Sequence, residues 1–297
     1  MGSNHKEGLR DPMQYTETVL TADDSTELFV RHYLPATNKT SQTVMIVHGT
    51  SEHGRRYDHV ARMFVEHGWN VIVPDSRGHG RSGGVPTHIR DFHHYILDLE
   101  IIQEHFHSSP RQTVMLGHSL GGLVALRYAQ TFPNRLTALI LLSPLLKVKV
   151  PIPLTTLALG KALSFVAPRT RFRSRVNSAD TTRTQEAVAQ RLKDPLIHRS
   201  VTAGWFFAMK SAMAAAWAEA DRLKLPLLVM QAGQDRIVDP TVPEPWLKSA
   251  GSSDKTFRFF PEHFHELLNE PDWQDTADSI LKWLQARIPQ TQQAQHG

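Results

Sequence analysis

The ten residues from 113 to 122 read TVMLGHSLGG, and this stretch decides the fold of the chain. An apolar run with the character of a buried strand ends in the pattern Gly-x-Ser-x-Gly and passes directly into helix-forming residues, 123–129. A strand before this pattern and a helix after it are the context of a nucleophile elbow, a sharp corner that presents a serine. Gly117 and Gly121 lack side chains, so strand and helix can approach each other closely around Ser119. The same residues also fit an ordinary strand-to-helix turn, and partners elsewhere in the chain must decide between the two interpretations.

Length and composition exclude several classes of protein. The chain of 297 residues is long enough to bury a large core, either as one domain with an insertion or as two small domains. Its formal net charge of +4 is too small to imply a nucleic-acid partner. It contains no cysteine, which excludes disulfides, thiolate nucleophiles and cysteine-ligated zinc.

The two ends of the chain carry no predicted core. Residues 1–12 and 291–297 are polar, and we expect them to be flexible tails. No run of residues resembles a signal peptide or a membrane span. The expected location is therefore the cytoplasm.

Short apolar strands alternate with helices on both sides of the elbow. This order predicts parallel strands joined by crossover helices that cover both faces of one sheet. We therefore expect an α/β fold with a mostly parallel sheet of eight strands, formed by residues 13–144 and 224–290. Ligands of such sheets bind beyond the carboxyl ends of the strands, where the polar loops of this chain also lie. The predicted strands are 17–20, 27–34, 43–47, 69–74, 113–118, 136–142, 225–230 and 256–260, and the predicted core helices include 91–107, 242–249 and 272–288.

Residues 145–223 interrupt this alternation after the sixth strand, and we expect them to form a helical cap. The predicted cap helices are a nearly all-apolar one at 154–166, a short one at 185–191 and a long one from about residue 201. Large side chains recur at i, i+4 spacing along the long helix. This stripe predicts either core packing or the wall of an acyl tunnel, and it consists of Trp205, Met209, Met213 and Trp217.

The helix at 154–166 has a single charged residue, Lys161, so it must be buried or face something apolar. One interpretation is that this part of the cap docks on an anionic lipid surface at a membrane. The other is a helix packed on the core with solvated arginines around it. The basic residues that flank it are Lys147, Lys149, Arg169, Arg171, Arg173 and Arg175.

A serine hydroxyl becomes a nucleophile only with a base that takes its proton and an anion that orients the base. Asp235 and His265 each follow a predicted strand in the second half of the chain, and the order Ser119, Asp235, His265 accompanies a nucleophile elbow. Asp239 is the weaker candidate for the acid, because it lies beyond the strand end and fits a helix N-cap. His263 is the weaker candidate for the base, because His265 opens a short helical turn.

The oxyanion that forms in such chemistry needs donors that are already aimed at it. The backbone N–H of Leu120, at the start of the helix after Ser119, is one candidate. The N–H of Thr50, in the loop after strand 43–47, is the second. Histidines occur in pairs along the chain, but none has the i, i+4 spacing with an intervening glutamate that zinc hydrolases use, so no metal or other cofactor is expected.

Combined, these motifs resemble the α/β-hydrolases of the monoacylglycerol lipase and lysophospholipase group. The resemblance implies hydrolysis of an ester with a single acyl chain, a cap that gates an apolar groove, and no cofactor. It extends over nearly the whole chain and rests on HGTSEH at 48–53, RY at 56–57, DSRGHGRS at 75–82, GHSLGG at 117–122, DPL at 194–196, GQD at 233–235 and HE at 265–266.

The resemblance also implies roles in the first loop. In that group, a glutamate and an arginine of this loop line the pocket for the glycerol head, and here they are Glu52 and Arg56. Ser51 stands where the family usually has glycine, which alters the space or the polarity beside the head group. The expected activity is therefore that of a serine esterase acting on lipids, most simply a monoacylglycerol lipase. The alternatives are a lysophospholipase, a short-chain carboxylesterase and a non-catalytic binding protein of the same fold.

Overall fold

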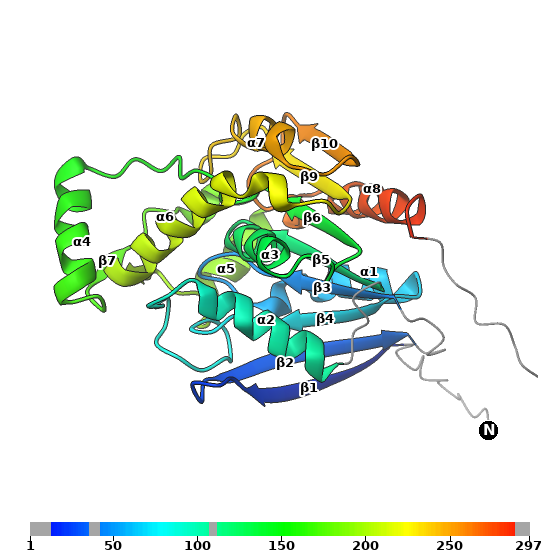
Figure 1. Ribbon diagram of the computed structural model, residues 1–297, viewed down its shortest axis with the longest axis horizontal. Coiled ribbons are helices and arrows are strands. Elements are labelled where there is room, and N and C mark those ends of the chain that lie inside the picture. Colours follow the sequence, from blue (N-terminus) through cyan, green and yellow to red (C-terminus); the bar gives the residue numbers. More distant parts are fainter. Residues whose placement is uncertain (1–12, 36–41, 107–111, 289–297) are drawn as a thin grey trace, which may run out of the picture.

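The computed structural model describes residues 13–35, 42–106 and 112–288 (Figure 1). Both tails predicted from the sequence, residues 1–12 and 291–297, lie outside these ranges. One sheet of eight strands forms the centre of the molecule, and helices cover both of its faces. The predicted fold class is therefore confirmed.

The strands lie in the order β1-β2-β4-β3-β5-β6-β9-β10. All neighbours from β4 to β10 are parallel, whereas β2 pairs antiparallel with both β1 and β4 at one edge of the sheet. Because parallel strands end at the same edge, the loops after β3, β5, β9 and β10 meet there. The bounds are β1 (Met13–Thr21), β2 (Glu27–Pro35), β3 (Thr43–Val47), β4 (Asn70–Pro74), β5 (Thr113–His118), β6 (Ala138–Leu142), β9 (Leu227–Ala232) and β10 (Lys255–Phe260).

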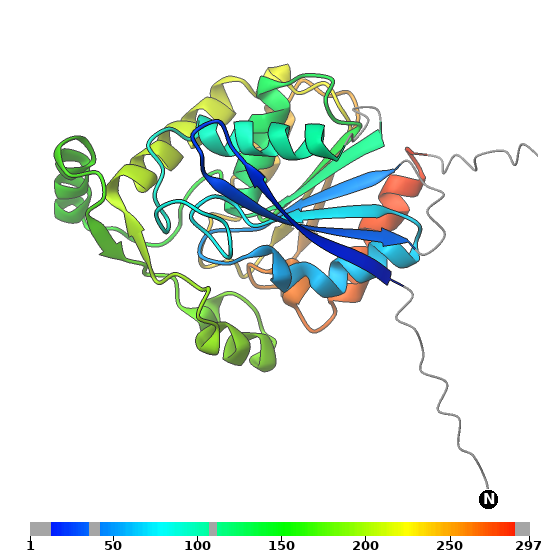
Figure 2. The ribbon, with the colours of Figure 1, turned by 90° about the horizontal axis from the view of Figure 1, so that it is seen from below.

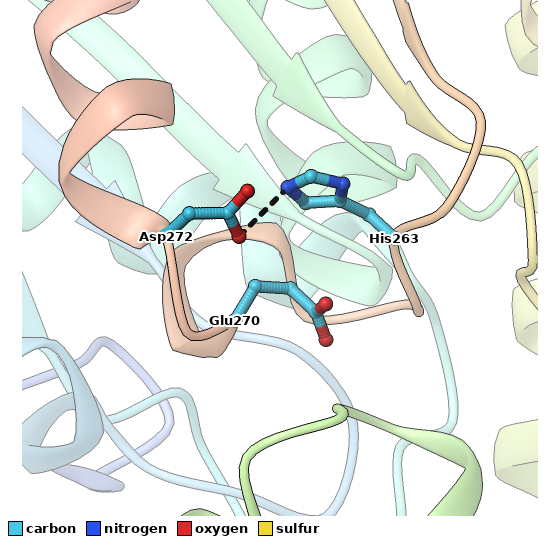
Figure 3. Close-up of side chains that lie close together, drawn as sticks. All are labelled: His263, Glu270 and Asp272. Atoms are coloured by element: carbon cyan, nitrogen blue, oxygen red, sulfur yellow. Dashed lines mark ion pairs between the residues drawn. The ribbon is translucent and has the colours of Figure 1, made fainter.

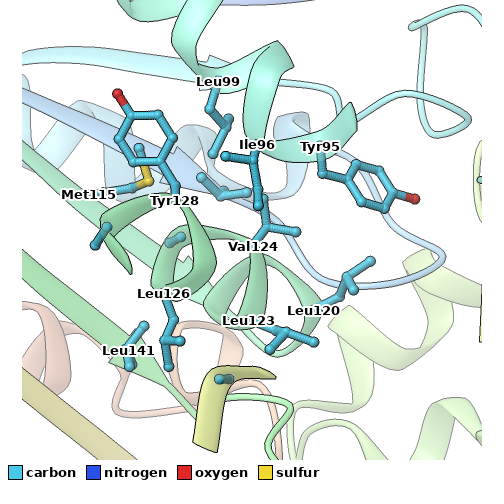
Figure 4. Packing of buried hydrophobic residues seen from close by; sticks show 14 of the residues in the cluster. Tyr95, Ile96, Leu99, Met115, Leu120, Leu123, Val124, Leu126, Tyr128 and Leu141 are labelled. Atoms are coloured by element: carbon cyan, nitrogen blue, oxygen red, sulfur yellow. The ribbon is translucent and has the colours of Figure 1, made fainter. Parts of the chain in front are cut away.

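Buried side chains form one apolar layer on each face of the sheet. On one face, α2, α3 and α7 pack on the strands, and Figure 4 shows Val124 of α3 beside Ile96 of α2. On the other face, α1 and α8 supply Phe64 and Ile280, which are fully buried. The bounds of these helices are α1 (Asp58–Glu66), α2 (His93–His105), α3 (Leu120–Thr131), α7 (Pro243–Ser249) and α8 (Trp273–Gln285).

The segment predicted to form a cap, residues 145–223, lies between β6 and β9 and projects from one side of the sheet (Figure 2); we call this segment the cap. Its helices follow the prediction, but the cap also contains a two-stranded antiparallel sheet that the sequence analysis missed. Residues 171–173 of the arginine-rich segment form one of these strands, and the side chains of Arg171 and Arg173 are exposed on it. The cap elements are α4 (Leu154–Val166), β7 (Arg171–Arg173), α5 (Gln185–Lys193), β8 (Ser200–Thr202) and α6 (Ala203–Ala218).

Helix α4 lies at the outer end of the cap and is largely exposed (Figure 1). Gly160, its one buried residue, faces the ring of Phe207 on α6. Leu154 and Val166 are 82% and 80% exposed. Of the two interpretations of this helix, packing on the core is therefore wrong, and docking on a lipid surface stays a prediction. None of the helices in the described part of the chain has the combined length and apolar character needed to cross a bilayer.

Candidate active site

Ser119 forms the corner between β5 and α3, as the motif predicted. Its φ of 53° and ψ of −116° lie outside the ordinary helix and strand regions, so the corner is strained. A Cβ on Gly121 would overlap the carbonyl oxygen of Val47, and one on Gly117 would overlap the backbone of Gly121. Gly121 is therefore required by close packing of the elbow against β3, and Gly117 by close packing within the elbow.

Asp235 and His265 are brought together at the carboxyl ends of β9 and β10. His265 Nδ1 lies 2.6 Å from Asp235 Oδ2, and both side chains are buried. The other carboxylate oxygen, Oδ1, accepts the backbone N–H groups of Ile237 and Val238 at 2.8 and 3.0 Å. These bonds hold the carboxylate in one orientation and direct the imidazole.

The pKa values of this pair move in the directions that their contact requires. Burial raises the pKa of Asp235, but the charge and the hydrogen bond of His265 outweigh it and lower the pKa below its ordinary value. Burial lowers the pKa of His265, but the Asp235 carboxylate outweighs it and raises this pKa. The imidazole is therefore a stronger base than a free histidine.

The two competing residues have other partners. Asp239 Oδ1 accepts the backbone N–H and the hydroxyl of Thr241, at 3.1 and 2.7 Å, while Oδ2 pairs with Lys147 at 2.9 Å. The Asp239 side chain thus closes a turn by accepting the N–H two residues further along the chain. The N-cap of α7 is Val242, so the predicted capping role of Asp239 is wrong. His263 Nε2 pairs with Asp272 at 3.1 Å.

The loop after β10, which carries His265 and which we call the base loop, also carries His263. Figure 3 shows the side chain of His263 close to those of Glu270 and Asp272. Their ligand atoms lie within 4.8 Å of one another, which is close enough to surround a metal ion. However, Arg183 of the cap hydrogen-bonds to Glu270 and lies 3.2 Å from Asp272. Because a guanidinium neutralises both carboxylates, this cluster is an ion-pair seam between cap and core.

Ser119 and His265 line the same cavity, which has a volume of about 490 Å³. Among the described residues, no hydrogen bond joins the Ser119 hydroxyl to the imidazole, and such bonds often form only when substrate is bound. His118 lies between the elbow and the base loop. Its ring centroid is 4.7 Å from that of His265, and its Nε2 is 3.2 Å from the His265 carbonyl oxygen.

The two predicted oxyanion donors, the N–H groups of Thr50 and Leu120, lie in different elements. Thr50 lines the cavity, and Leu120 is the first residue of α3, where helix N–H groups lack intrahelical partners. The neighbouring Ser51 has a φ of 60°, in the left-handed region that glycine enters without strain. Ser51 is therefore one of the non-glycine residues that adopt a positive φ in the described part of the chain.

Glu52 and Arg56, the residues expected at the head group, form part of a buried charge cluster. Glu52 lines the cavity, whereas Arg56 is not among the lining residues. Glu52 Oε1 accepts the backbone N–H of Gly49 at 2.6 Å and the hydroxyl of Tyr57 at 3.0 Å. Burial raises the pKa of Glu52, but hydrogen bonding by His118 and the charge of Arg56 hold it well below its ordinary range.

The sequence analysis assigned no role to two further members of this cluster, Glu266 and Arg191. Arg56 Nη2 lies 2.6 Å from Glu266 Oε2, and Arg191 of α5 lies 3.4 Å from Glu266 Oε1. Glu266 directly follows His265, which was a usable signal. Arg191 carried none, because its distance from the base loop in the sequence is 75 residues.

Apolar side chains of the cap form much of the cavity wall. Trp205 and Met209 belong to both the core layer and the cavity lining, so core packing is confirmed for these two residues and the acyl tunnel stays a prediction. Met213 is buried in the core, whereas Trp217 is 39% exposed and leaves the stripe. The cavity therefore has an apolar part under the cap and a polar part at the strand ends.

Comparison with known proteins gives concordant results. The sequence model of the family described as serine aminopeptidase, S33, matches residues 38–272. The chain is 31% identical to phospholipase YtpA of Bacillus subtilis over 78% of this chain and 90% of that one. It is 29% identical to the monoacylglycerol lipase of Mycolicibacterium smegmatis over 82% and 88% of the two chains. The crystal structure of the Paleococcus ferrophilus monoacylglycerol lipase superposes with a TM-score of 0.81, at 27% identity, over 88% of this chain and 99% of that one.

Proposed function

The chain belongs to the α/β-hydrolase family described as serine aminopeptidase, S33, and from this premise we propose that it hydrolyses esters of lipids with a single acyl chain. It is a serine hydrolase of the monoacylglycerol lipase and lysophospholipase group. Monoacylglycerols are the substrates that we favour. The observation that carries the proposal is the buried Asp235–His265 pair, whose histidine lines the same cavity as Ser119.

In the proposed mechanism, Ser119 Oγ attacks the ester carbonyl while His265 Nε2 accepts its proton. The N–H groups of Thr50 and Leu120 stabilise the oxyanion. His265 then returns the proton to the departing alcohol and leaves an acyl-enzyme on Ser119. Water, activated by the same imidazole, releases the fatty acid. Asp235 keeps the ring oriented throughout and stabilises its charged form.

The volume and the lining of the cavity support a single-chain lipid. Its volume of about 490 Å³ is within the range that holds small-molecule ligands. We propose that the acyl chain lies against Leu157, Phe172 and Met209, which line the cavity from the cap. The head group then lies at the polar end, beside Glu52 and with Arg56 behind it. In this arrangement residues 145–223 act as one cap on the core of residues 13–144 and 224–290.

A substrate panel tests the proposal. Wild-type protein is given monoacylglycerols of increasing chain length, lysophosphatidylcholine and p-nitrophenyl esters. We expect the highest kcat/KM for monoacylglycerols with chains long enough to fill the apolar part of the cavity, because each buried methylene contributes roughly 0.8 kcal/mol. Preference for the shortest esters would instead identify a carboxylesterase. No hydrolysis of any ester would favour a non-catalytic binding protein.

Lysophospholipids are the second candidate substrates. The relation to a Bacillus subtilis phospholipase favours them, as do the cavity-lining Arg173 and Arg199, which have no carboxylate partner in the described part of the chain. A higher kcat/KM for lysophosphatidylcholine than for a monoacylglycerol of equal chain length would establish this alternative.

We further propose that α4 docks the cap on an anionic lipid surface. Leu154 and Val166 expose apolar side chains that no part of the described chain covers. The basic residues nearby make the charge of this surface complementary to anionic lipid. Arg171 and Arg175, for example, donate only to neutral oxygens, such as the carbonyls of Pro86 and Pro151.

Vesicle binding measures this contact. The double variant Leu154→Ser with Val166→Ser is expected to bind phosphatidylglycerol vesicles roughly 10- to 100-fold more weakly, because two exposed apolar side chains no longer enter the bilayer. Hydrolysis of a soluble p-nitrophenyl ester should not change, since neither residue lines the cavity. Val19→Ser, which alters a 56% exposed side chain on β1, is the control. Equal binding by the double variant and the control variant would contradict docking through α4.

A further inference from the structure

A cluster of buried charges lies directly behind the proposed base. The Glu266 carboxylate is held by Arg56 at 2.6 Å and by Arg191 at 3.4 Å. The side chains of these three residues are 3%, 11% and 8% exposed. Asn269 Nδ2 also donates to the carboxylate, at 3.1 Å. The residue that follows His265 is therefore fixed by its side chain from several directions.

Arg191 is the contribution of the cap to this cluster. It lies on α5, whereas Arg56 and Glu266 belong to the core. The backbone supports the same contact, because the N–H of Glu266 donates to the carbonyl of Thr181, also in the cap, at 2.7 Å. The loop that carries His265 is thus attached to the cap by both main chain and side chain.

The electrostatics of the base depend on this cluster. Burial raises the pKa of Glu266, but Arg56 and Arg191 outweigh it and lower the pKa, so the side chain is a carboxylate. Its charge, like those of Asp235 and Glu52, raises the pKa of His265. The other ionisable groups on this side are His118, against the His265 ring, and Lys149, which donates to the Asp235 carbonyl at 2.8 Å.

We propose that Arg191 is a positioning residue for the reaction: by pairing with Glu266 across the boundary between cap and core, it fixes the loop that carries His265. The inference rests on the proposed function, in which His265 is the base. It also makes the catalytic geometry depend on where the cap lies. A movement that carries α5 away from the core removes one of the two cations from Glu266 and frees the base loop.

The test compares three variants in hydrolysis of a soluble ester. Arg191→Gln is expected to lower kcat roughly 10- to 100-fold, because small displacements of reacting groups cost about that much. It should also move the acidic limb of the kcat/KM profile to higher pH, since Glu266 then attracts a proton to His265 more strongly. Arg191→Lys keeps the charge and should restore the position of the limb. Arg183→Gln is the matched control and should behave like wild type, because the Arg183 side chain pairs with Glu270 on the same seam but is itself 35% exposed.

Several outcomes overturn the inference. One is a wild-type kcat and pH profile for Arg191→Gln. Another is a rise in KM alone, which would make Arg191 a substrate-binding residue of the cavity wall. Equal losses in Arg191→Gln and Arg183→Gln with an unmoved acidic limb would indicate general loosening of the cap.

Arg191→Gln removes one of the two cations from the buried Glu266 carboxylate, and this variant can therefore fail to fold. A further variant keeps the inference testable in that case. Arg191→Gln combined with Glu266→Gln removes the pair and leaves Arg56 with Glu52 at 3.3 Å. This double variant should show a reduced kcat and an acidic limb at lower pH than wild type, and wild-type values for both would overturn the inference. Failure of the proposed function is distinct, because wild type itself would then show no hydrolysis that depends on Ser119.

Discussion

Replacing Ser119 by alanine should lower kcat for a soluble ester by roughly 10⁶-fold, because the group that attacks the carbonyl is lost. The remaining donors and the cavity still bind substrate, so the expected residual rate exceeds that of water by about 10³- to 10⁴-fold. Burst-phase kinetics with a p-nitrophenyl ester measure the loss. A fluorophosphonate probe should label wild type and leave the variant unlabelled.

Ser143→Ala is a matched control for this substitution. Ser143 lies at the end of the neighbouring strand β6, is fully buried and also has a positive φ, of 40°. Its hydroxyl has no hydrogen-bond partner among the described residues, so the change to alanine removes no bond seen there. Probe labelling that persists in Ser119→Ala but disappears in Ser143→Ala would contradict the assignment and make Ser143, after β6, the nucleophile.

Asp235→Asn should lower kcat by about 10⁴-fold without disturbing the fold. The N–H groups of Ile237 and Val238 point at Oδ1, so the new amide must place its oxygen there and its NH₂ against His265. Nδ1 of the ring then has to accept a hydrogen bond, and the ring proton moves to Nε2. In this tautomer the imidazole cannot take the proton of Ser119.

Comparison with Asp239→Asn makes this result specific. Asp239 is bound to Lys147 and Thr241 on the surface, and we expect near wild-type turnover after its replacement. Steady-state rates and a thermal unfolding curve for both variants separate lost chemistry from lost stability. Normal turnover in Asp235→Asn together with a large loss in Asp239→Asn would move the role of the acid to Asp239.

The core elements were predictable because their signals are local. The continuous apolar character of 43–47 and 113–118 identifies parallel strands buried on both faces, and the structure places β3 and β5 at those residues. The cap was predicted less well. Strand β7 has three residues, too few to establish a period, and it pairs with residues 200–202, which are distant in the sequence.

For helix α4 and for the loops that carry Asp235 and His265, the sequence also left a question that only tertiary contacts answer. Apolar composition at 154–166 predicted that the helix needs an apolar partner, but it could not indicate that the rest of the chain leaves Leu154 and Val166 uncovered. Likewise, chain order indicated Asp235 and His265 without excluding their neighbours. The hydrogen bond of 2.6 Å joins this pair, while His263 turns to Asp272.

By itself, the sequence determined the succession of strands and helices in the core and the elbow at Ser119, because period and glycine placement are properties of neighbouring residues. It also indicated Asp235 and His265 as partners of Ser119 through their order in the chain. Only the tertiary structure decided which charges surround Glu266 and that Arg191 is among them. Such pairs depend on how cap and core pack together. The two residues of such a pair lie far apart in the chain, so no pattern of neighbouring residues predicts that their side chains meet.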